Sequence, residues 1–337
     1  MTSTKLRLGL LSTGNIARQF AAGVRASDRC VLQAVGSRTL ASAQAFAEAQ
    51  QVGNAYGSYD KVIADPDVDA IYIGLPNSMH HPWAIKALRA GKHVLCEKPI
   101  AVSVGEAQQM YQAAADAKRV LVEAFMYRCH PQTLKVMDTV RSGAIGVVRM
   151  IRTSFNYKTG RIADNIRFNA DLAGGALMDI GCYCIDFSQL VAGAAPTRVS
   201  ACARIHESGV DEMAAGVMQF ANGIIASFTC GMTAAADNAA YICGSEGFIH
   251  IPVPWKPQPG AAMFTIAHGT PPRMDMGKAP SVAQDPQVVK VDAPRDVYAY
   301  EADDFAAAVL DGSAPRMPKE ATLSNMRVLD ELRSQVA

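Results

Sequence analysis

One short segment, residues 94–100, constrains the fold of this chain more than any other. It reads Val-Leu-Cys-Glu-Lys-Pro-Ile, so an apolar run passes directly into an acid, a lysine and a proline. Pro99 has no N–H and a fixed φ, so the strand predicted at residues 93–96 must end there. Open α/β sheets bind their ligands at the carboxyl ends of their strands. The sequence therefore predicts that Lys98 lies at the ligand-binding edge of a sheet.

The first 125 residues alternate between short apolar runs and helix-like stretches. Strands are predicted at residues 6–11, 31–36, 70–75, 93–96 and 120–125. Helices are predicted between them, at residues 16–26, 41–50 and 82–90 and from residue 103 onward. Alternation at this spacing is typical of a doubly wound parallel sheet. Residues 1–125 are therefore expected to form a Rossmann domain of the α/β class that binds a dinucleotide.

The pattern changes after residue 125. Helices are expected at residues 132–142 and 176–191, and strands at residues 147–155, 198–205, 214–220, 224–230, 239–243 and 248–251. Residues 252–294 are rich in Pro and Gly and are predicted to be mostly loop, and helices at about 298–310 and 319–334 close the chain. Consecutive strands without helices between them favour an antiparallel sheet. Residues 126–337 are therefore expected to form an α+β domain with a large, mostly antiparallel open sheet that binds the substrate.

Composition limits the partners of the protein. Lys and Arg number 32 against 31 Asp and Glu, a net charge of +1 that gives no electrostatic case for nucleic acid or an anionic membrane. No apolar run approaches the roughly 18 residues of a membrane span, and the short polar start leaves no room for a signal peptide. The eight cysteines are dispersed and form no Cys-x-x-Cys pair. We therefore expect reduced thiols, no metal site and a cytoplasmic location.

The turn after the first predicted strand matches a cofactor-binding motif. Residues 12–17, Ser-Thr-Gly-Asn-Ile-Ala, align with the dinucleotide fingerprint G-x-G-x-x-G/A, with Ser12 in place of the first glycine. Gly14 would let the backbone approach a pyrophosphate at the helix N-terminus. A tight turn without a ligand is the alternative. The cofactor contacts predicted here are Gly9, Ser12, Thr13, Gly14, Asn15 and Ile16.

The end of the second strand indicates which cofactor to expect. Enzymes that use NAD usually carry an acid at this place, about 20 residues after the fingerprint. Here the sequence reads Gly-Ser-Arg-Thr, from Gly36 to Thr39, and holds no acid. Ser37 and Arg38 suit a 2′-phosphate, although Arg38 could equally be a solvated loop residue. We expect NADP, with NAD as the less favoured alternative.

These segments resemble the glucose–fructose oxidoreductase and inositol dehydrogenase-like family of oxidoreductases. The resemblance extends to LPNSMH (75–80), GKHVLCEKP (91–99), EAFMYR (123–128) and GGALMDIGCYCID (174–186). This chain has Tyr183 at a position where many relatives carry histidine. With tyrosine there, the chain looks like a member of the branch that contains dimeric dihydrodiol dehydrogenase and NADP-dependent D-xylose dehydrogenase. The resemblance implies an open second-domain sheet that mediates dimerisation. It also implies cofactor contacts from Leu75, Pro76, Asn77, His80, Glu97 and Lys98.

Three residues are candidates for the chemistry. Oxidising an alcohol needs a base for the hydroxyl proton, and Tyr183 could be that base if a lysine ammonium such as that of Lys98 favours its phenolate. Asp179 precedes Tyr183 by one helical turn and faces the same way, so it could orient Lys98 or hold a substrate hydroxyl. The alternative is a capping acid and a core aromatic. Candidate substrate contacts are Phe155, Arg167 and Trp255, although Trp255 could equally pack a loop.

The sequence thus predicts an NADP-dependent oxidoreductase that transfers a hydride between the nicotinamide and a hydroxyl or carbonyl of a sugar, polyol or vicinal diol. Two alternatives stay open. One is a hydrolase or lyase that keeps its nicotinamide bound and uses transient oxidation, and the other is a non-catalytic NADPH-binding sensor. The second-domain sheet has an apolar face that no following helix clearly covers. We therefore expect a homodimer or a dimer of dimers.

Overall fold

The computed structural model describes residues 5–268 and 286–336, which divide into two compact units. The first unit combines Met1–His130, Asn165–Gly174 and Arg295–Asp330, and the second combines Pro131–Asp164, Gly175–Pro294 and Glu331–Ala337. The sequence predicted one boundary, after residue 125. The chain instead passes between the units several times, because two later segments return to the first unit.

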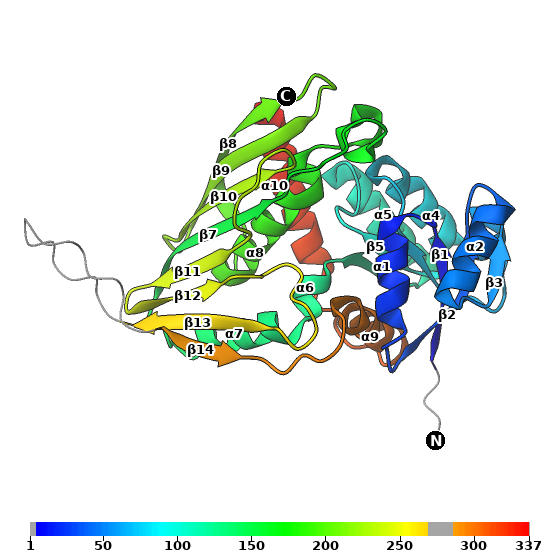
Figure 1. Ribbon diagram of the computed structural model, residues 1–337, viewed down its shortest axis with the longest axis horizontal. Helices are drawn as coiled ribbons and strands as arrows, with labels where there is room; N and C mark the ends of the chain where they lie inside the picture. Colours follow the sequence, from blue (N-terminus) through cyan, green and yellow to red (C-terminus); the bar gives the residue numbers. More distant parts are fainter. Residues whose placement is uncertain (1–4, 269–285, 337) are drawn as a thin grey trace, which may run out of the picture. The chain divides into compact units, whose positions relative to one another are not determined.

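The first unit is built on a six-stranded parallel sheet (Figure 1). Its strands are β1 (Leu6–Leu11), β2 (Cys30–Gly36), β3 (Asn54–Tyr56), β4 (Ala70–Ile73), β5 (His93–Glu97) and β6 (Leu121–Ala124). The strand order is β3-β2-β1-β4-β5-β6. Successive strands are added on one side of β1 up to β3 and on its other side from β4 onward, so the switch point lies between β1 and β4. Such sheets bind their ligands at this place. The predicted doubly wound α/β fold is confirmed, and only the short strand β3 was not predicted.

Helices alternate with these strands along the chain. They are α1 (Asn15–Val24), α2 (Leu40–Gln50), α3 (Tyr59–Ala64), α4 (His80–Arg89), α5 (Val104–Ala117) and α6 (Met126–Cys129), with the short 3-10 turns η1 (Asn77–Met79), η2 (Ile166–Phe168) and η3 (Ala170–Leu172). Ser103 caps α5, because its hydroxyl accepts the Glu106 amide at 3.3 Å. The capping residue fixes where α5 begins.

Helix α9 (Val297–Leu310) corrects the predicted domain division. The sequence placed it in the second domain, but it belongs to the first unit. Phe20 of α1 stacks on Tyr72 of β4 with ring centroids 3.7 Å apart, and Tyr298 of α9 meets Phe20 edge-on at 6.2 Å. The reason is burial: periodicity shows that a helix has an apolar face, but not which apolar surface that face will cover. Helix α10 (Lys319–Val336) follows and crosses the division at Asp330.

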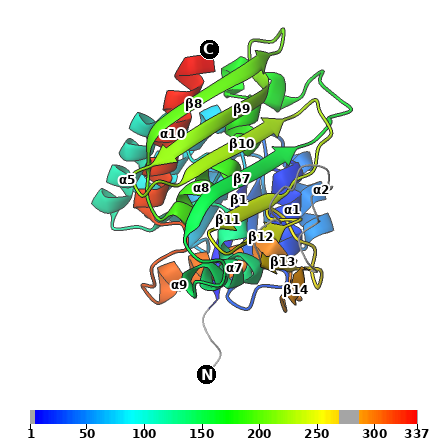
Figure 2. The same ribbon diagram turned by 90° about the vertical axis from the view of Figure 1, so that its left-hand side faces the viewer.

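The second unit is built on an eight-stranded sheet, seen face-on in Figure 2. Its strands are β7 (Val148–Asn156), β8 (Pro196–Ile205), β9 (Asp211–Phe220), β10 (Ile225–Gly231), β11 (Ala240–Gly244), β12 (Gly247–Ile251), β13 (Met263–His268) and β14 (Gln287–Lys290), in the order β14-β13-β12-β11-β7-β10-β9-β8. All neighbours are antiparallel except β7 and β10. The predicted mostly antiparallel sheet is confirmed.

Two strands of this sheet lie where the sequence predicted mostly loop. β13 and β14 fall within residues 252–294, of which residues 269–285 lie outside the described range. Their runs of six and four residues are too short to stand out among the surrounding prolines and glycines. They extend the sheet beyond β12, so the sheet is larger than the sequence alone predicted.

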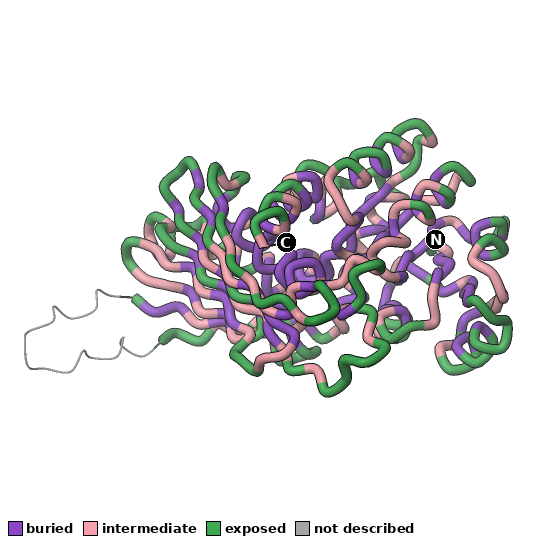
Figure 3. Tube along the Cα trace, turned by 90° about the horizontal axis from the view of Figure 1, so that it is seen from above, coloured by how far each residue is buried: buried purple, intermediate pink, exposed green. Residues whose placement is uncertain are grey.

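The two faces of the eight-stranded sheet differ. Helix α8 (Cys182–Ala192) packs against β7 and β10 on one face, and α7 (Pro131–Arg141) contacts β13. On the other face, Ile225 pairs with Met150 and Ser227 pairs with Val217, so these side chains share one side. Exposed and buried residues mix along the strands in Figure 3. In the described part of the chain, no helix is long and apolar enough to cross a membrane.

Candidate active site

A buried histidine fixes the segment that follows β5. His80 is fully buried, its Nδ1 lies 2.9 Å from the Pro99 carbonyl oxygen, and its Nε2 lies 2.9 Å from that of Leu75. Burial lowers the pKa of His80 and the charge of Lys98 adds to this shift, whereas the carbonyl oxygens of Pro99 and Leu75 oppose it. The imidazole thereby ties the loops after β4 and β5 together and holds the half-buried Lys98 at the sheet edge. The predicted cofactor contact of His80 stays a prediction.

Glu97, the residue before Lys98, has its side chain buried within the first unit. Its Oε1 accepts the Tyr72 hydroxyl at 2.7 Å, and only 6 % of the residue is exposed. Glu301 of α9 is also buried, and neither of its carboxyl oxygens accepts a hydrogen bond from a described residue. Burial raises the pKa of Glu301 well above its usual range, and the charge of Glu97 adds to the shift. Burial therefore favours the neutral form of Glu301 in the folded chain.

The backbone of the predicted phosphate turn has free space beside Gly14. Ser12 has φ +127°, its hydroxyl accepts the Gly14 amide at 2.9 Å, and its own amide donates to the Gly36 carbonyl at 3.2 Å. The Thr13 and Ser37 hydroxyls lie 3.2 Å apart. A Cβ built on Gly14 would meet only the Ser12 hydroxyl within 4 Å. The turn can therefore be approached closely, as a pyrophosphate requires.

Other predicted cofactor contacts lie around this turn. Asn15 and Ile16 open α1 directly after Gly14. Gly9 lies inside β1, and a Cβ there would come within 2.6 Å of Val62. The absence of a side chain at Gly9 therefore lets Val62 pack closely against β1 in the core. Pro76 precedes η1, and Asn77 donates to the Ala173 carbonyl at 2.8 Å.

The end of β2 carries the groups predicted for a 2′-phosphate. Ser37 is buried, Arg38 is exposed, and the Thr39 hydroxyl caps α2 by accepting the Ser42 amide at 3.3 Å. No acid lies in the first turn of α2. A guanidinium, hydroxyls and a helix N-terminus without a nearby carboxylate suit a phosphate group. The residues present therefore fit NADP.

The helix that carries the other candidate residues begins unusually. A single helix was predicted at residues 176–191, but the structure starts with a π turn, η4 (Leu177–Gly181), which continues as α8. Such turns are frequently found at functional sites. Asp179 lies in the π turn and Tyr183 in the first turn of α8, so the predicted pair shares one continuous helix in the second unit.

Tyr157 is a site residue that the sequence analysis missed. Its hydroxyl donates to Asp179 Oδ2 at 2.8 Å, and both side chains are half-buried. Tyr157 follows β7 directly, so an element distant in the chain fixes the carboxylate. A tyrosine just after a strand carries no sequence signal for this role, because its partner is identified only by the fold.

Aromatic side chains hold the ring of Tyr183. Its centroid lies 5.3 Å from that of Phe155 and 5.9 Å from that of Trp255, and Phe155 and Trp255 stack at 5.6 Å. Phe187 packs edge-on against Trp255, whose indole N–H donates to the Ser154 carbonyl at 2.9 Å. Two predicted substrate contacts, Phe155 and Trp255, thus lie against Tyr183. Trp255 is only 2 % exposed, so it supports the tyrosine from within the unit.

The third predicted substrate contact, Arg167, lies in a different unit. It belongs to the segment Asn165–Gly174, which the bond between Asn77 and Ala173 ties to the loop after β4. The structure therefore groups Arg167 with the predicted cofactor-binding residues, and groups Asp179 and Tyr183 with the eight-stranded sheet.

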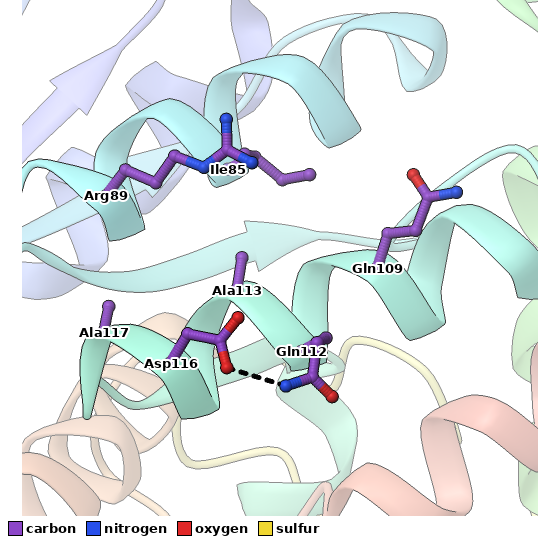
Figure 4. A pocket seen from close by; sticks show the side chains of 7 residues that line it. All are labelled: Ile85, Arg89, Gln109, Gln112, Ala113, Asp116 and Ala117. Carbon is purple, nitrogen blue, oxygen red and sulfur yellow. Dashed lines mark hydrogen bonds between the residues drawn. The ribbon is translucent and has the colours of Figure 1, made fainter.

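A separate groove of about 470 Å³ lies between α4 and α5 (Figure 4). Its walls are Ile85, Arg89, Gln109, Gln112, Ala113, Asp116 and Ala117. The Gln112 amide donates to Asp116 at 2.7 Å across one wall. None of the lining residues is among the predicted site residues, and we assign the groove no role.

Family models match both parts of the chain. Residues 6–125 match the model of an oxidoreductase family with an NAD-binding Rossmann fold, and residues 133–250 match the C-terminal domain model of the same family. Together the two matches span most of the described residues.

Known proteins are similar over most of their length. The NADP-dependent D-xylose 1-dehydrogenase 2 of Haloferax volcanii is 33 % identical over 329 residues, covering 97 % of this chain and 96 % of that protein. The trans-1,2-dihydrobenzene-1,2-diol dehydrogenase of Mus musculus is 36 % identical over 256 residues, covering 75 % and 76 %. A 3-ketoreductase from Actinomadura kijaniata, solved with NADP and TDP-benzene, superposes with a TM-score of 0.87 at 29 % identity, covering 99 % of this chain and 98 % of that one.

Proposed function

The chain belongs to the Gfo/Idh/MocA family of oxidoreductases, and we propose that it is an NADP-dependent member acting on a sugar, polyol or vicinal diol. In this reaction a hydride passes between the nicotinamide and a carbon that bears a hydroxyl or carbonyl. Relatives named for D-xylose and for a dihydrodiol support this substrate class. NADP in the name of one relative and in the crystal of a structural neighbour supports the cofactor.

The position of Tyr183 is the observation that carries the proposal. Phe155 and Trp255 hold its ring, and the same helix carries Asp179, whose carboxylate is fixed by Tyr157. A phenol held in this way is suited to exchange a proton with a substrate oxygen. A helix that served packing alone would need neither the π turn nor a half-buried carboxylate bonded to a tyrosine.

Each candidate residue has a distinct role in the proposal. Tyr183 takes the hydroxyl proton in alcohol oxidation and returns it in carbonyl reduction. Lys98 favours the tyrosinate by its charge and polarises the substrate oxygen. Asp179 orients Lys98 or holds a neighbouring substrate hydroxyl. The nicotinamide, when bound, accepts or supplies the hydride.

The first unit supplies the binding groups for NADP in this proposal. The amides of Asn15 and Ile16 at the start of α1 bind the pyrophosphate, while Ser37 and Arg38 hold the 2′-phosphate. The missing acid after β2 disfavours NAD, because no carboxylate is available there for the ribose hydroxyls. Leu75, Pro76, Asn77, His80 and Glu97 remain predicted contacts or supports of the nicotinamide half.

Replacing the tyrosine hydroxyl tests the acid–base role. Tyr183→Phe keeps the ring and its packing, so NADPH binding should stay near normal while kcat falls by about 10²–10⁴-fold. Tyr241→Phe is a matched control, because Tyr241 lies beside Arg152 on the face of the sheet that α8 does not cover. Retention of most activity in Tyr183→Phe with the true substrate would show that the proton passes through another group.

Lys98→Met tests whether the two residues act together. It should also abolish most turnover, and the double variant should lose little beyond either single one, because groups that act as a unit are not additive. Additive losses would indicate that the two residues act independently.

A substrate screen separates the proposal from its alternatives. Aldoses, polyols and vicinal diols should be tested with added NADP⁺ at mildly alkaline pH, following nicotinamide absorbance. Net reduction of the added cofactor indicates a dehydrogenase. Product formation with no net change in cofactor would indicate a hydrolase or lyase, and binding of NADPH with no turnover of any substrate would favour a sensor.

A further inference from the structure

A carboxylate from a neighbouring strand holds the start of the helix that carries Asp179 and Tyr183. Asp211 is the first residue of β9, and its Oδ2 accepts the amide of Leu177, the first residue of the π turn, at 2.6 Å. The amide of Ala176 also stabilises this carboxylate. The first amides of a helix have no acceptor within that helix, so Asp211 supplies one from another element of the same unit.

Gly175 shows how closely Asp211 approaches this turn. Gly175 has φ +109°, and a Cβ at this position would overlap Asp211 Oδ1. Its carbonyl accepts the amide of Asp179 at 2.9 Å. The Asp211 carboxylate, the glycine and the residue that we assign to the chemistry therefore form one continuous set of contacts.

Few charges act on Asp211 in the described part of the chain. Burial raises the pKa of Asp211 to about 6, and the amide of Leu177 and the charge of Arg333 oppose this shift. The thiol of Cys230 is also near, and the charge of Asp211 contributes to the raised pKa of that thiol. Asp211 therefore carries its charge at pH 7 and loses it under mildly acidic conditions.

We propose that Asp211 is a positioning residue for the Asp179–Tyr183 pair, acting through the amides at the start of their helix. The inference rests on the proposed role of Tyr183 in proton transfer. A carboxylate accepts hydrogen bonds more strongly than a neutral group and complements the positive end of a helix. When Asp211 loses its charge, the π turn is held less firmly and the Tyr183 hydroxyl is less well placed for proton transfer.

Asp211→Asn tests this inference, with Glu212→Gln as the matched control. Asparagine keeps the size and an acceptor oxygen but removes the charge. Glu212 is the next residue, is buried, pairs with Arg204 at 2.6 Å and faces the other side of the strand. In Asp211→Asn, kcat should fall about 2- to 30-fold, the range of an N-terminal capping interaction, with NADPH affinity unchanged. Glu212→Gln should behave as the wild type.

The pH profile distinguishes positioning from a general loss of stability. The kcat of the wild type and of Glu212→Gln should fall as pH drops below about 6. In Asp211→Asn, the fall of kcat centred near pH 6 should be absent. An acid limb that persists unchanged in Asp211→Asn would overturn the inference.

Hydrogen exchange in the protein without substrate gives a second readout. After correction for intrinsic rates, the amides of residues 176–179 should exchange faster in Asp211→Asn than in Glu212→Gln. If Asp211→Asn does not fold, the same amides in the wild type should exchange faster at pH 5 than at pH 7. Unchanged exchange refutes the anchoring by Asp211 whatever Tyr183→Phe does. Faster exchange together with full activity of Tyr183→Phe refutes the catalytic role of Tyr183 instead.

Discussion

Arg38 is the residue on which the proposed cofactor preference depends. It is exposed at the end of β2, beside hydroxyls and without a neighbouring acid. A charge-assisted bond to a 2′-phosphate is worth about 1.5–3 kcal/mol, so Arg38→Ala should reduce the preference for NADPH over NADH by about 10–150-fold. Fluorescence titration of both cofactors measures this. Arg25→Ala, which removes an exposed arginine at the other end of α1, is the control. An unchanged preference in Arg38→Ala would exclude the assigned contact.

Glu301 makes stability depend on pH. Its pKa is raised in the folded state by burial and by Glu97, so the folded chain holds this proton more tightly than the unfolded chain. The free energy of unfolding should therefore be highest below the unfolded-state pKa of about 4.3 and fall as pH rises toward the folded-state pKa. The contribution is up to about 1.4 kcal/mol per pH unit in that window.

Glu301→Gln should remove this slope, because glutamine stays neutral. Urea unfolding between pH 5 and 8 measures the effect, and Glu48→Gln, at an exposed position of α2, should keep the wild-type slope. A wild-type slope in Glu301→Gln would mean that the carboxyl group of Glu301 is ionised throughout this pH range.

At the scale of elements, the glycines at the two ends of the helix that carries Asp179 and Tyr183 differ in their surroundings. Gly175 has φ +109° and contacts Asp211, whereas Gly193 has φ +67° and no atom within 4 Å of a built Cβ. Gly193→Ala should cost only about 1 kcal/mol, the usual price of alanine in a left-handed cap. Gly175→Ala must also displace Asp211, so it should cost more than 2 kcal/mol and abolish most activity. Chemical denaturation and kcat measure both, and equal losses would contradict the role given to Asp211.

The sequence predicts elements better than it predicts their partners. Buried parallel strands such as β1 and β5 are continuous apolar runs, and they are found close to their predicted bounds. The π turn was not predicted, because over five residues its hydrophobic pattern cannot be told from that of an α-helix. The destination of α9 was missed because a helical pattern identifies an apolar face and not the surface that it covers.

The same distinction applies to the candidate site. Lys98, Asp179 and Tyr183 stand in recognisable local motifs, so the sequence could nominate them. Tyr157 and Asp211 could not be nominated, because their bonds to the helix that carries Asp179 and Tyr183 join positions 22 and 34 residues apart. Such contacts follow from strand register, which short-range patterns do not encode.

At the scale of the whole molecule, the face of the eight-stranded sheet that α8 does not cover predicts self-association. Met150, Val217 and Ile225 lie together on this face and are 41 %, 50 % and 54 % exposed. Contiguous apolar surface of this kind usually marks a partner site, and we expect a second copy of the chain. Light scattering at micromolar concentration should give a dimer or tetramer. Val217→Lys should shift the oligomeric state toward monomer, whereas Leu40→Lys, at an exposed leucine of α2, should leave the oligomeric state unchanged. A monomeric wild type would refute the prediction.

The return of α9 to the first unit has a consequence for synthesis in the cell. Until residues 295–330 leave the ribosome, the apolar surface of Phe20 and the rings beside it cannot be covered by Tyr298. At the usual 5–20 residues per second, the first unit stays incomplete for roughly 10 to 40 s after residue 130 is made. During that interval it presents an apolar surface that chaperones could bind. A fragment that stops near residue 125 should for the same reason aggregate instead of folding alone.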